Sequence, residues 1–202
     1  MHHPVVHLGV WLAASVLLIG AGTLAIGLRA DLPSALKSTG FQAECSLTLS
    51  LALASTLAAF SLSVPNRRAL WTSLLPAMAF ALWAARILFM ATSENRLELG
   101  NGLPCLRDIA MLSLVPGGLL FFMLSRGAPL RIGTVGFYAA SGVAALSCLA
   151  TEFLCRNENP LHTLVWHFLP VLAASVAGLG IGRLCFGRFA FPERRYRVHG
   201  KR

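Results

Sequence analysis

The stretch PCLRDIAMLSLVPGGLLFFMLSR (Pro104–Arg126) decides the fold class of this chain. It begins with a cysteine, an arginine and an aspartate, continues without a charged residue from Ile109 to Ser125, and ends at an arginine. A helix needs about 20 mostly apolar residues to cross about 30 Å of hydrocarbon. The stretch therefore predicts a membrane-spanning helix with polar groups at both of its ends.

The whole chain has the composition that this stretch indicates. Of its 202 residues, 56% are hydrophobic and only 12% are charged, whereas a soluble surface needs roughly 25–35% charged residues. Apolar runs of spanning length cover residues 8–28, 43–64, 70–92, 106–124, 132–154 and 161–184. We therefore predict an all-α polytopic membrane protein with six transmembrane helices, forming a single integral membrane domain over residues 1–202.

The basic residues are distributed unequally between the two sides of the membrane. The side that holds both termini, the short connections after the second and fourth runs and the tail 185–202 carries eleven of the 17 lysines and arginines. Seven of the eight acidic residues lie on the other side. The positive-inside rule then places both termini in the cytoplasm, with the chain in the inner membrane and a basic cytoplasmic tail. Attraction to anionic lipid explains the basic pI, so no direct nucleic-acid binding is expected.

Two cysteines lie at the outer ends of neighbouring spans. Cys105 precedes the fourth span and Cys155 follows the fifth, and the short turn between these spans favours antiparallel neighbours whose outer ends converge. In an oxidising compartment the two thiols can form a disulfide. Left reduced, they can bind a soft metal ion together with His162, Glu158 or Asp108. Both alternatives remain open from the residues alone.

The other cysteines and a second histidine have simpler interpretations. Cys45 opens the second span on the outer side and is an auxiliary ligand candidate, whereas Cys148 and Cys185 are interpreted as small apolar fillers. His162 and His167 lie near the start of the last span, where we interpret them first as interfacial anchors and second as metal ligands.

Charged residues within the spans predict one structural contact. Arg86 lies inside the third span, and Glu44 and Glu152 lie at matching depth in the second and fifth. An ion pair is favoured over a transport site. No nucleophile–base constellation and no C-x-x-C motif occur, so we expect no enzyme and no bound cofactor.

The order of sequence features along the chain resembles that of a known family. The resemblance lies in three segments, residues 27–68, 104–131 and 145–189. A cysteine opens the fourth span, a Gly127-Ala128-Pro129 turn follows it, a cysteine closes the fifth span, and Trp166 lies in the sixth. This pattern resembles the NrsF family of six-helix bacterial membrane proteins. Family members usually carry a longer cytoplasmic stretch than MHHPVVH before the first span, so no partner-binding residue is assigned.

The resemblance implies an anti-sigma factor. It would hold an extracytoplasmic-function sigma factor on the cytoplasmic side and release it when stress acts on Cys105 and Cys155, the signal-sensing thiols. Cys45 and His162 are possible auxiliary ligands for a metal of unspecified identity. The alternative that we keep is a small transporter or metal-handling inner-membrane protein; a membrane redox enzyme is a third and weaker one.

Overall fold

The computed structural model describes residues 4–63, 69–94, 96–127 and 131–187, and every regular element within these ranges is helical. Six segments are long and apolar enough to cross a membrane. The predicted all-α, multi-pass architecture is therefore confirmed. Arg67, Arg68, Ala128-Pro129 of the predicted turn, and the tail from residue 188 lie outside the described residues.

The helices follow the apolar runs closely. The last span is composite, since a short α-helix and a π-helical turn precede its main part. The elements are α1 (Pro4–Ile26), α2 (Leu32–Ala35), α3 (Thr39–Leu62), α4 (Ala69–Ser93), α5 (Leu103–Ser125), α6 (Ile132–Glu152), α7 (Pro160–Thr163), η1 (Leu164–Phe168) and α8 (Leu169–Gly187).

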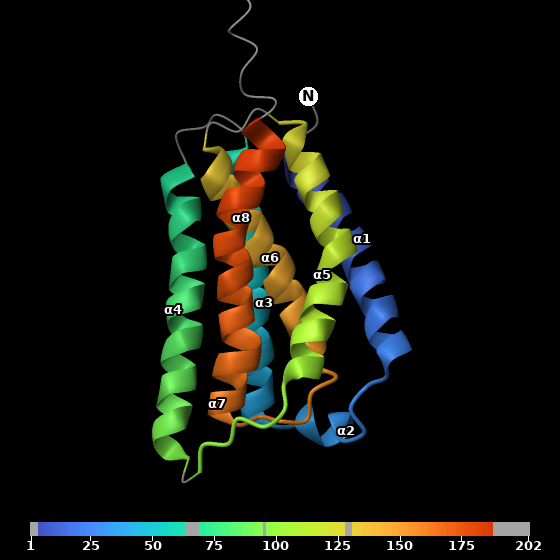
Figure 1. Ribbon diagram of the computed structural model, residues 1–202, viewed down its shortest axis with the longest axis vertical. Coiled ribbons are helices and arrows are strands. Elements are labelled where there is room, and N and C mark those ends of the chain that lie inside the picture. Colours follow the sequence, from blue (N-terminus) through green and yellow to red (C-terminus); the bar gives the residue numbers. More distant parts are fainter. Residues whose placement is uncertain (1–3, 64–68, 95, 128–130, 188–202) are drawn as a thin grey trace, which may run out of the picture.

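The long helices run side by side along the long axis of the molecule (Figure 1). The start of α1 and the end of α8 lie at one end of the bundle, which we call the terminal end. The opposite end, which we call the α7 end, holds α2, α7, the start of α5 and the end of α6. The two sets of connections are therefore separated by the full length of the bundle.

Helix starts at the α7 end follow from local sequence. The Ser38 side chain accepts a hydrogen bond from the backbone N–H of Phe41 at the start of α3, and the Asn159 side chain accepts one from Leu161 at the start of α7. A proline occupies the first turn of α2, α5 and α7, where its missing N–H leaves no hydrogen bond broken. These caps fix where each helix emerges beside the α7 end.

Helix α6 is the centre of the bundle and packs against α8, α3 and α5. Its closest approach is to α8, where a Cβ on Gly136 would lie 2.2 Å from the carbonyl oxygen of Gly178 and a Cβ on Gly182 would lie 2.5 Å from that of Ile132. The Ser141 hydroxyl also donates to the Ser175 hydroxyl at 2.6 Å. Small residues bring the two backbones into contact, as in other membrane helix pairs.

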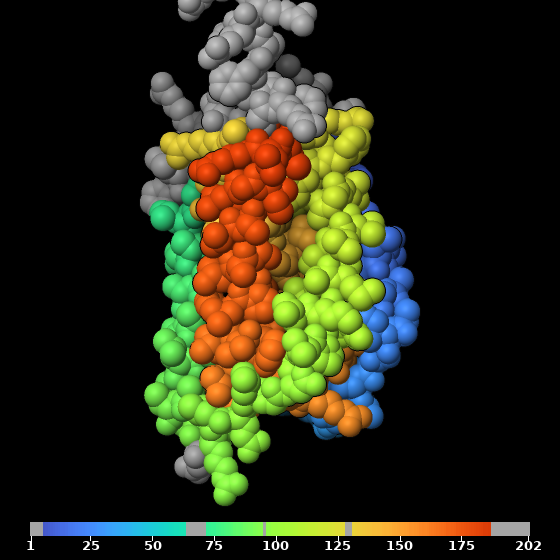
Figure 2. Space-filling view, in the orientation of Figure 1, coloured from blue at the N-terminus to red at the C-terminus, as the bar shows by residue number. Residues whose placement is uncertain are grey.

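The lateral surface is apolar, as lipid contact requires. Figure 2 shows one face of this surface, with α8 lying between α4 and α5 and with α6 behind them. Large hydrophobic side chains such as Leu114, Leu184 and Phe89 are exposed on the outer faces of the helices. The buried core instead contains small residues and a few large anchors, among them Trp11, whose indole N–H donates to the Pro116 carbonyl at 3.0 Å.

Candidate functional site

Four sulfur- and nitrogen-bearing side chains meet at the α7 end. Cys105 lies in the first turn of α5, Cys155 in the segment after α6, His162 in α7 and His167 in η1. One ligand atom from each lies within 4.8 Å of the others. We call these residues the thiol–imidazole cluster. The structure thus brings the two predicted thiols together with His162, the predicted auxiliary ligand, and adds His167 to them.

The His162 ring lies between the two thiols. Its Nε2 atom is 3.4 Å from the Cys155 sulfur and 3.8 Å from the Cys105 sulfur. Its Nδ1 atom is 2.8 Å from the carbonyl oxygen of Leu99. A carbonyl can only accept, so Nδ1 carries a hydrogen, and Nε2 is the ring atom that faces the two sulfurs.

The His167 ring completes the cluster from the next helical turn. It is 4% exposed, its Nε2 atom has no hydrogen-bond partner among the described residues, and its ring centroid is 5.7 Å from that of His162. His162 is 1% exposed. The interpretation of these two side chains as interfacial anchors is therefore wrong, because both are buried inside the bundle.

The segments around the cluster are held by backbone contacts. The Cys155 N–H donates to the Thr151 carbonyl at 2.8 Å, which continues α6 towards the cluster. On the facing segment a Cβ on Gly102 would lie 2.0 Å from the Trp166 ring, and Gly100 has a φ of +59°. The segment before α5 therefore lies directly against the last span, and a side chain at either glycine would disturb this contact.

Hydrogen bonding changes the acidity of the accessible thiol. The pKa of Cys155 is lowered, first because the Cys105 side chain hydrogen-bonds to it and then because His167 lies near, although burial opposes the shift. A lowered pKa favours the thiolate, the form that binds metals and attacks oxidants. Cys155 is also the less buried thiol of the pair, so it is the one more open to reagents from outside.

Charged groups flank the cluster on the side of α2. Arg29 is buried and pairs with Asp31 at 2.8 Å and with Glu158 at 3.0 Å. Hydrogen bonding from Arg29 lowers the pKa of Asp31 to about 2. Of the predicted alternative ligands, Glu158 is therefore engaged with Arg29, and Asp108 pairs with its neighbour Arg107 at 2.8 Å.

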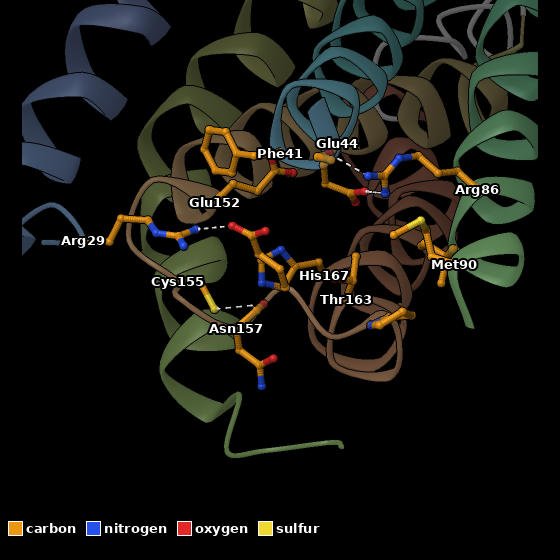
Figure 3. A pocket seen from close by; sticks show the side chains of 14 residues that line it. Arg29, Phe41, Glu44, Arg86, Met90, Glu152, Cys155, Asn157, Thr163 and His167 are labelled. Atoms are coloured by element: carbon orange, nitrogen blue, oxygen red, sulfur yellow. Dashed lines mark hydrogen bonds and ion pairs between the residues drawn. The ribbon is translucent and has the colours of Figure 1, made fainter. Parts of the chain in front are cut away.

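A cavity of about 80 Å³ adjoins the cluster. In Figure 3 it lies between Cys155 and His167 on one side and the Arg86–Glu44 pair on the other. The Glu44 carboxylate accepts from the Arg86 guanidinium and, in addition, from the indole of Trp83. The predicted ion pair therefore forms with Glu44. Both carboxylate oxygens of Glu152 are buried without a hydrogen-bond partner among the described residues.

The remaining cysteines lie outside the thiol–imidazole cluster. The Cys45 thiol interacts electrostatically with the Glu152 carboxylate. Cys148 is fully buried, and its sulfur lies within 4.8 Å of ligand atoms of Glu152 and His167, a grouping that the sequence interpretation missed because it treated Cys148 as filler. Cys148 and Glu152 are four positions apart and share one face of α6, but only the fold adds His167 to them. Cys185 is exposed near the terminal end.

Comparison with known proteins gives one result. No curated protein and no solved structure matches the chain. A family model does match: NrsF, described as negative regulator of sigma F, covers residues 2–187. This match includes all six long helices and all four residues of the thiol–imidazole cluster. The chain is therefore a member of the NrsF family of negative regulators of sigma F.

Proposed function

We propose that this protein is an anti-sigma factor of the bacterial inner membrane. It holds an extracytoplasmic-function sigma factor at its cytoplasmic face and releases it when stress acts on Cys105 and Cys155 at the periplasmic face. It is not an enzyme in this proposal, since its effect on transcription requires only binding and release. Family membership supports the sigma-factor partner.

The single observation that carries the sensing part is the meeting of two free thiols from distant parts of the chain. Cys105 and Cys155 are 50 positions apart, belong to the start of α5 and the segment after α6, and both contact His162 Nε2. Their environment lowers the pKa of Cys155, which favours reaction at neutral pH. A chemical signal at these thiols therefore acts on three segments at once.

The bundle offers a mechanical route from the thiols to the partner side. α5, α6 and the α7–η1–α8 segment each extend from the α7 end to the terminal end (Figure 1). α6 and α8 touch backbone to backbone, so they move as one packed pair rather than independently. A change in the spacing of their ends at the thiols is then passed to the opposite end, where the positive-inside rule places the cytoplasm.

The decisive experiment measures sigma-dependent transcription and sigma binding with the same variants. A strain with Cys105→Ser and Cys155→Ser should retain the sigma factor in co-purification but lose at least about tenfold induction by a thiol oxidant. Cys185→Ser, which changes an exposed thiol near the terminal end, is the matched control and should respond as the wild type does. Undiminished induction in the double variant would remove the sensing role, and failure of the wild type to capture the sigma factor would remove the anti-sigma role.

One observation favours the alternative class of a small transporter or metal-handling protein. The buried Glu152 carboxylate forms no ion pair among the described residues and lines a cavity, as ion-pathway groups in membrane proteins do. Proteoliposomes that contain the wild-type protein distinguish the two classes. We expect no uptake of Zn²⁺ above that of empty liposomes; uptake that Glu152→Gln abolishes would favour transport.

A further inference from the structure

The spacing of the thiol–imidazole cluster is that of a tetrahedral metal site. Zinc binds sulfur at about 2.3 Å and nitrogen at about 2.0–2.1 Å, so a sulfur and a nitrogen ligand of tetrahedral zinc lie about 3.6 Å apart. The His162 Nε2 atom is 3.4 Å from one sulfur and 3.8 Å from the other. All four ligand atoms lie within 4.8 Å of one another, so small side-chain adjustments suffice to close the site.

The π-helical turn explains how two histidines five positions apart reach one site. In a regular α-helix such positions point about 140° apart around the axis. Here the backbone N–H of Leu169 bonds to the carbonyl of Leu164, the i→i+5 pattern that widens the turn. The wider turn brings His167 back towards the side of His162, and the two rings are in contact. Such turns are frequent at functional sites.

The groups around the cluster prepare its histidines for a metal. Metal-bound histidines usually donate their second ring N–H to a carbonyl or carboxylate, which fixes the ring and the tautomer. His162 already does so through Nδ1 and Leu99. His167 adds an independent observation, because its buried Nε2 has no partner among the described residues and lies in the ligand group.

We propose that Cys105, Cys155, His162 and His167 bind a zinc-class divalent cation as a four-ligand tetrahedral site. This deepens the proposed function and rests on it only for the regulatory consequence. Two thiolates neutralise the charge of the cation, and any thiol still protonated gives its proton to water on binding. The complex is then neutral overall, which suits a buried position at the end of membrane-spanning helices. Sulfur and imidazole ligands favour Zn²⁺ and the softer Cd²⁺ over Mg²⁺ or Ca²⁺.

The bound cation would join segments that the empty cluster only brings near. It would link the first turn of α5, the segment after α6, α7 and η1 through four bonds. In the adjoining cavity Glu44 and Glu158 are paired with Arg86 and Arg29, whereas Glu152 forms no ion pair among the described residues. Metal occupancy would thus set the relative position of the helix ends, and the same bonds would protect both thiols from oxidation.

The test uses the full-length protein in lipid nanodiscs with Co²⁺ as a spectroscopic probe of the zinc site. We expect one Co²⁺ per chain, with the intense visible bands of tetrahedral coordination and a sulfur-to-cobalt charge-transfer band, all removed by one equivalent of Zn²⁺. His167→Ala, His162→Ala, Cys105→Ser and Cys155→Ser should each weaken Zn²⁺ binding by more than about 100-fold, since even second-shell changes cost 10–100-fold. Cys185→Ser and His7→Ala, which lie outside the cluster, should bind as the wild type does.

A conservative variant separates loss of a ligand from loss of folding. His167→Cys should retain tetrahedral Co²⁺ with a stronger charge-transfer band, because a third thiolate replaces an imidazole. The metal site is overturned if the wild type gives no tetrahedral spectrum, or if His162→Ala and His167→Ala bind Zn²⁺ as tightly as the wild type. Sigma capture and oxidant-induced release by the wild type are measured in parallel. If capture and release persist while metal binding fails, only the metal site is disproved. If the protein binds Zn²⁺ tightly but never captures the sigma factor, the metal site is supported and the proposed function is disproved.

Discussion

At the scale of single residues, the α7 end concentrates polar groups that a membrane protein normally avoids burying. The Glu44 carboxylate on α3 accepts hydrogen bonds from Arg86 and Trp83, which both lie on the neighbouring helix α4. His162 is satisfied by Leu99, whereas His167 has no partner for its Nε2. Buried polar groups with hydrogen-bond partners stabilise the fold, and a buried polar group without one marks a candidate binding site.

The Glu44–Arg86 pair gives a prediction about stability. Glu44→Gln removes the charge that compensates the partly buried guanidinium, and breaking such a pair costs about 3 kcal/mol. The variant should therefore unfold at lower denaturant concentration in detergent micelles, as followed by far-UV circular dichroism. Arg156→Gln breaks a 3.7 Å pair with Asp31 in which both side chains are exposed, and it should change the free energy of unfolding by less than about 1 kcal/mol. Equal effects of the two variants would contradict a stabilising role for Glu44.

At the scale of the helices, packing between α6 and α8 depends on the absence of side chains. A Cβ on Gly178 would lie 2.4 Å from the Gly136 carbonyl oxygen and 2.6 Å from the Ala140 methyl group. Backbone atoms cannot move aside cheaply, so this contact tolerates only glycine at position 178. These two helices, which belong to the proposed signal route, are therefore tightly fitted to each other.

Paired glycine variants in α8 test this fit. Gly178→Val should destabilise the protein by at least 1–3 kcal/mol, the usual range for overpacking a core. Gly180→Val is the matched control on the same helix, since a Cβ there meets nothing within 4 Å. Thermal unfolding of the two variants in the same detergent gives the comparison. Similar melting temperatures for both would show that the α6–α8 contact is looser than described.

The helices also show what the sequence could and could not predict. Apolar run length predicted all six spans, because crossing a bilayer imposes that length on any helix. Position at the outer ends of neighbouring spans predicted that Cys105 and Cys155 would meet. The π-helical turn at Leu164–Phe168 was not predictable, since no residue type marks it, and with the regular helical spacing His167 would point away from His162. The sequence also did not predict that Glu152 would lack an ion-pair partner. Glu44 and Glu152 lie at the same depth, and depth alone does not show which of the two carboxylates pairs with Arg86.

At the scale of the whole molecule, the proposal depends on which end faces which compartment. The thiol–imidazole cluster and the chain termini lie at opposite ends of the bundle (Figure 1). The distribution of basic residues predicts that the cluster faces the periplasm. Every step from signal to sigma factor follows from this sidedness.

Thiol labelling of intact spheroplasts tests the sidedness directly. A membrane-impermeant maleimide should modify Cys155, which is partly accessible and has a lowered pKa, and should leave Cys185 unmodified until the membrane is permeabilised. Peptide mass spectrometry reports each site separately, and a chelator keeps Cys155 free of metal. The reverse pattern, with Cys185 modified in intact cells, would invert the topology and place the thiols on the side of the sigma factor.

The close contact between Gly102 and the Trp166 ring gives the molecule an optical reporter of its own. This indole lies on the same helical turn as His167 and touches the segment that leads into Cys105, so its emission depends on how these segments are arranged. Any rearrangement at the cluster would shift the wavelength or intensity of that emission within the time of a stopped-flow mixing experiment. The first milliseconds of signalling could then be watched in an unmodified protein, with Trp166→Phe as the blank.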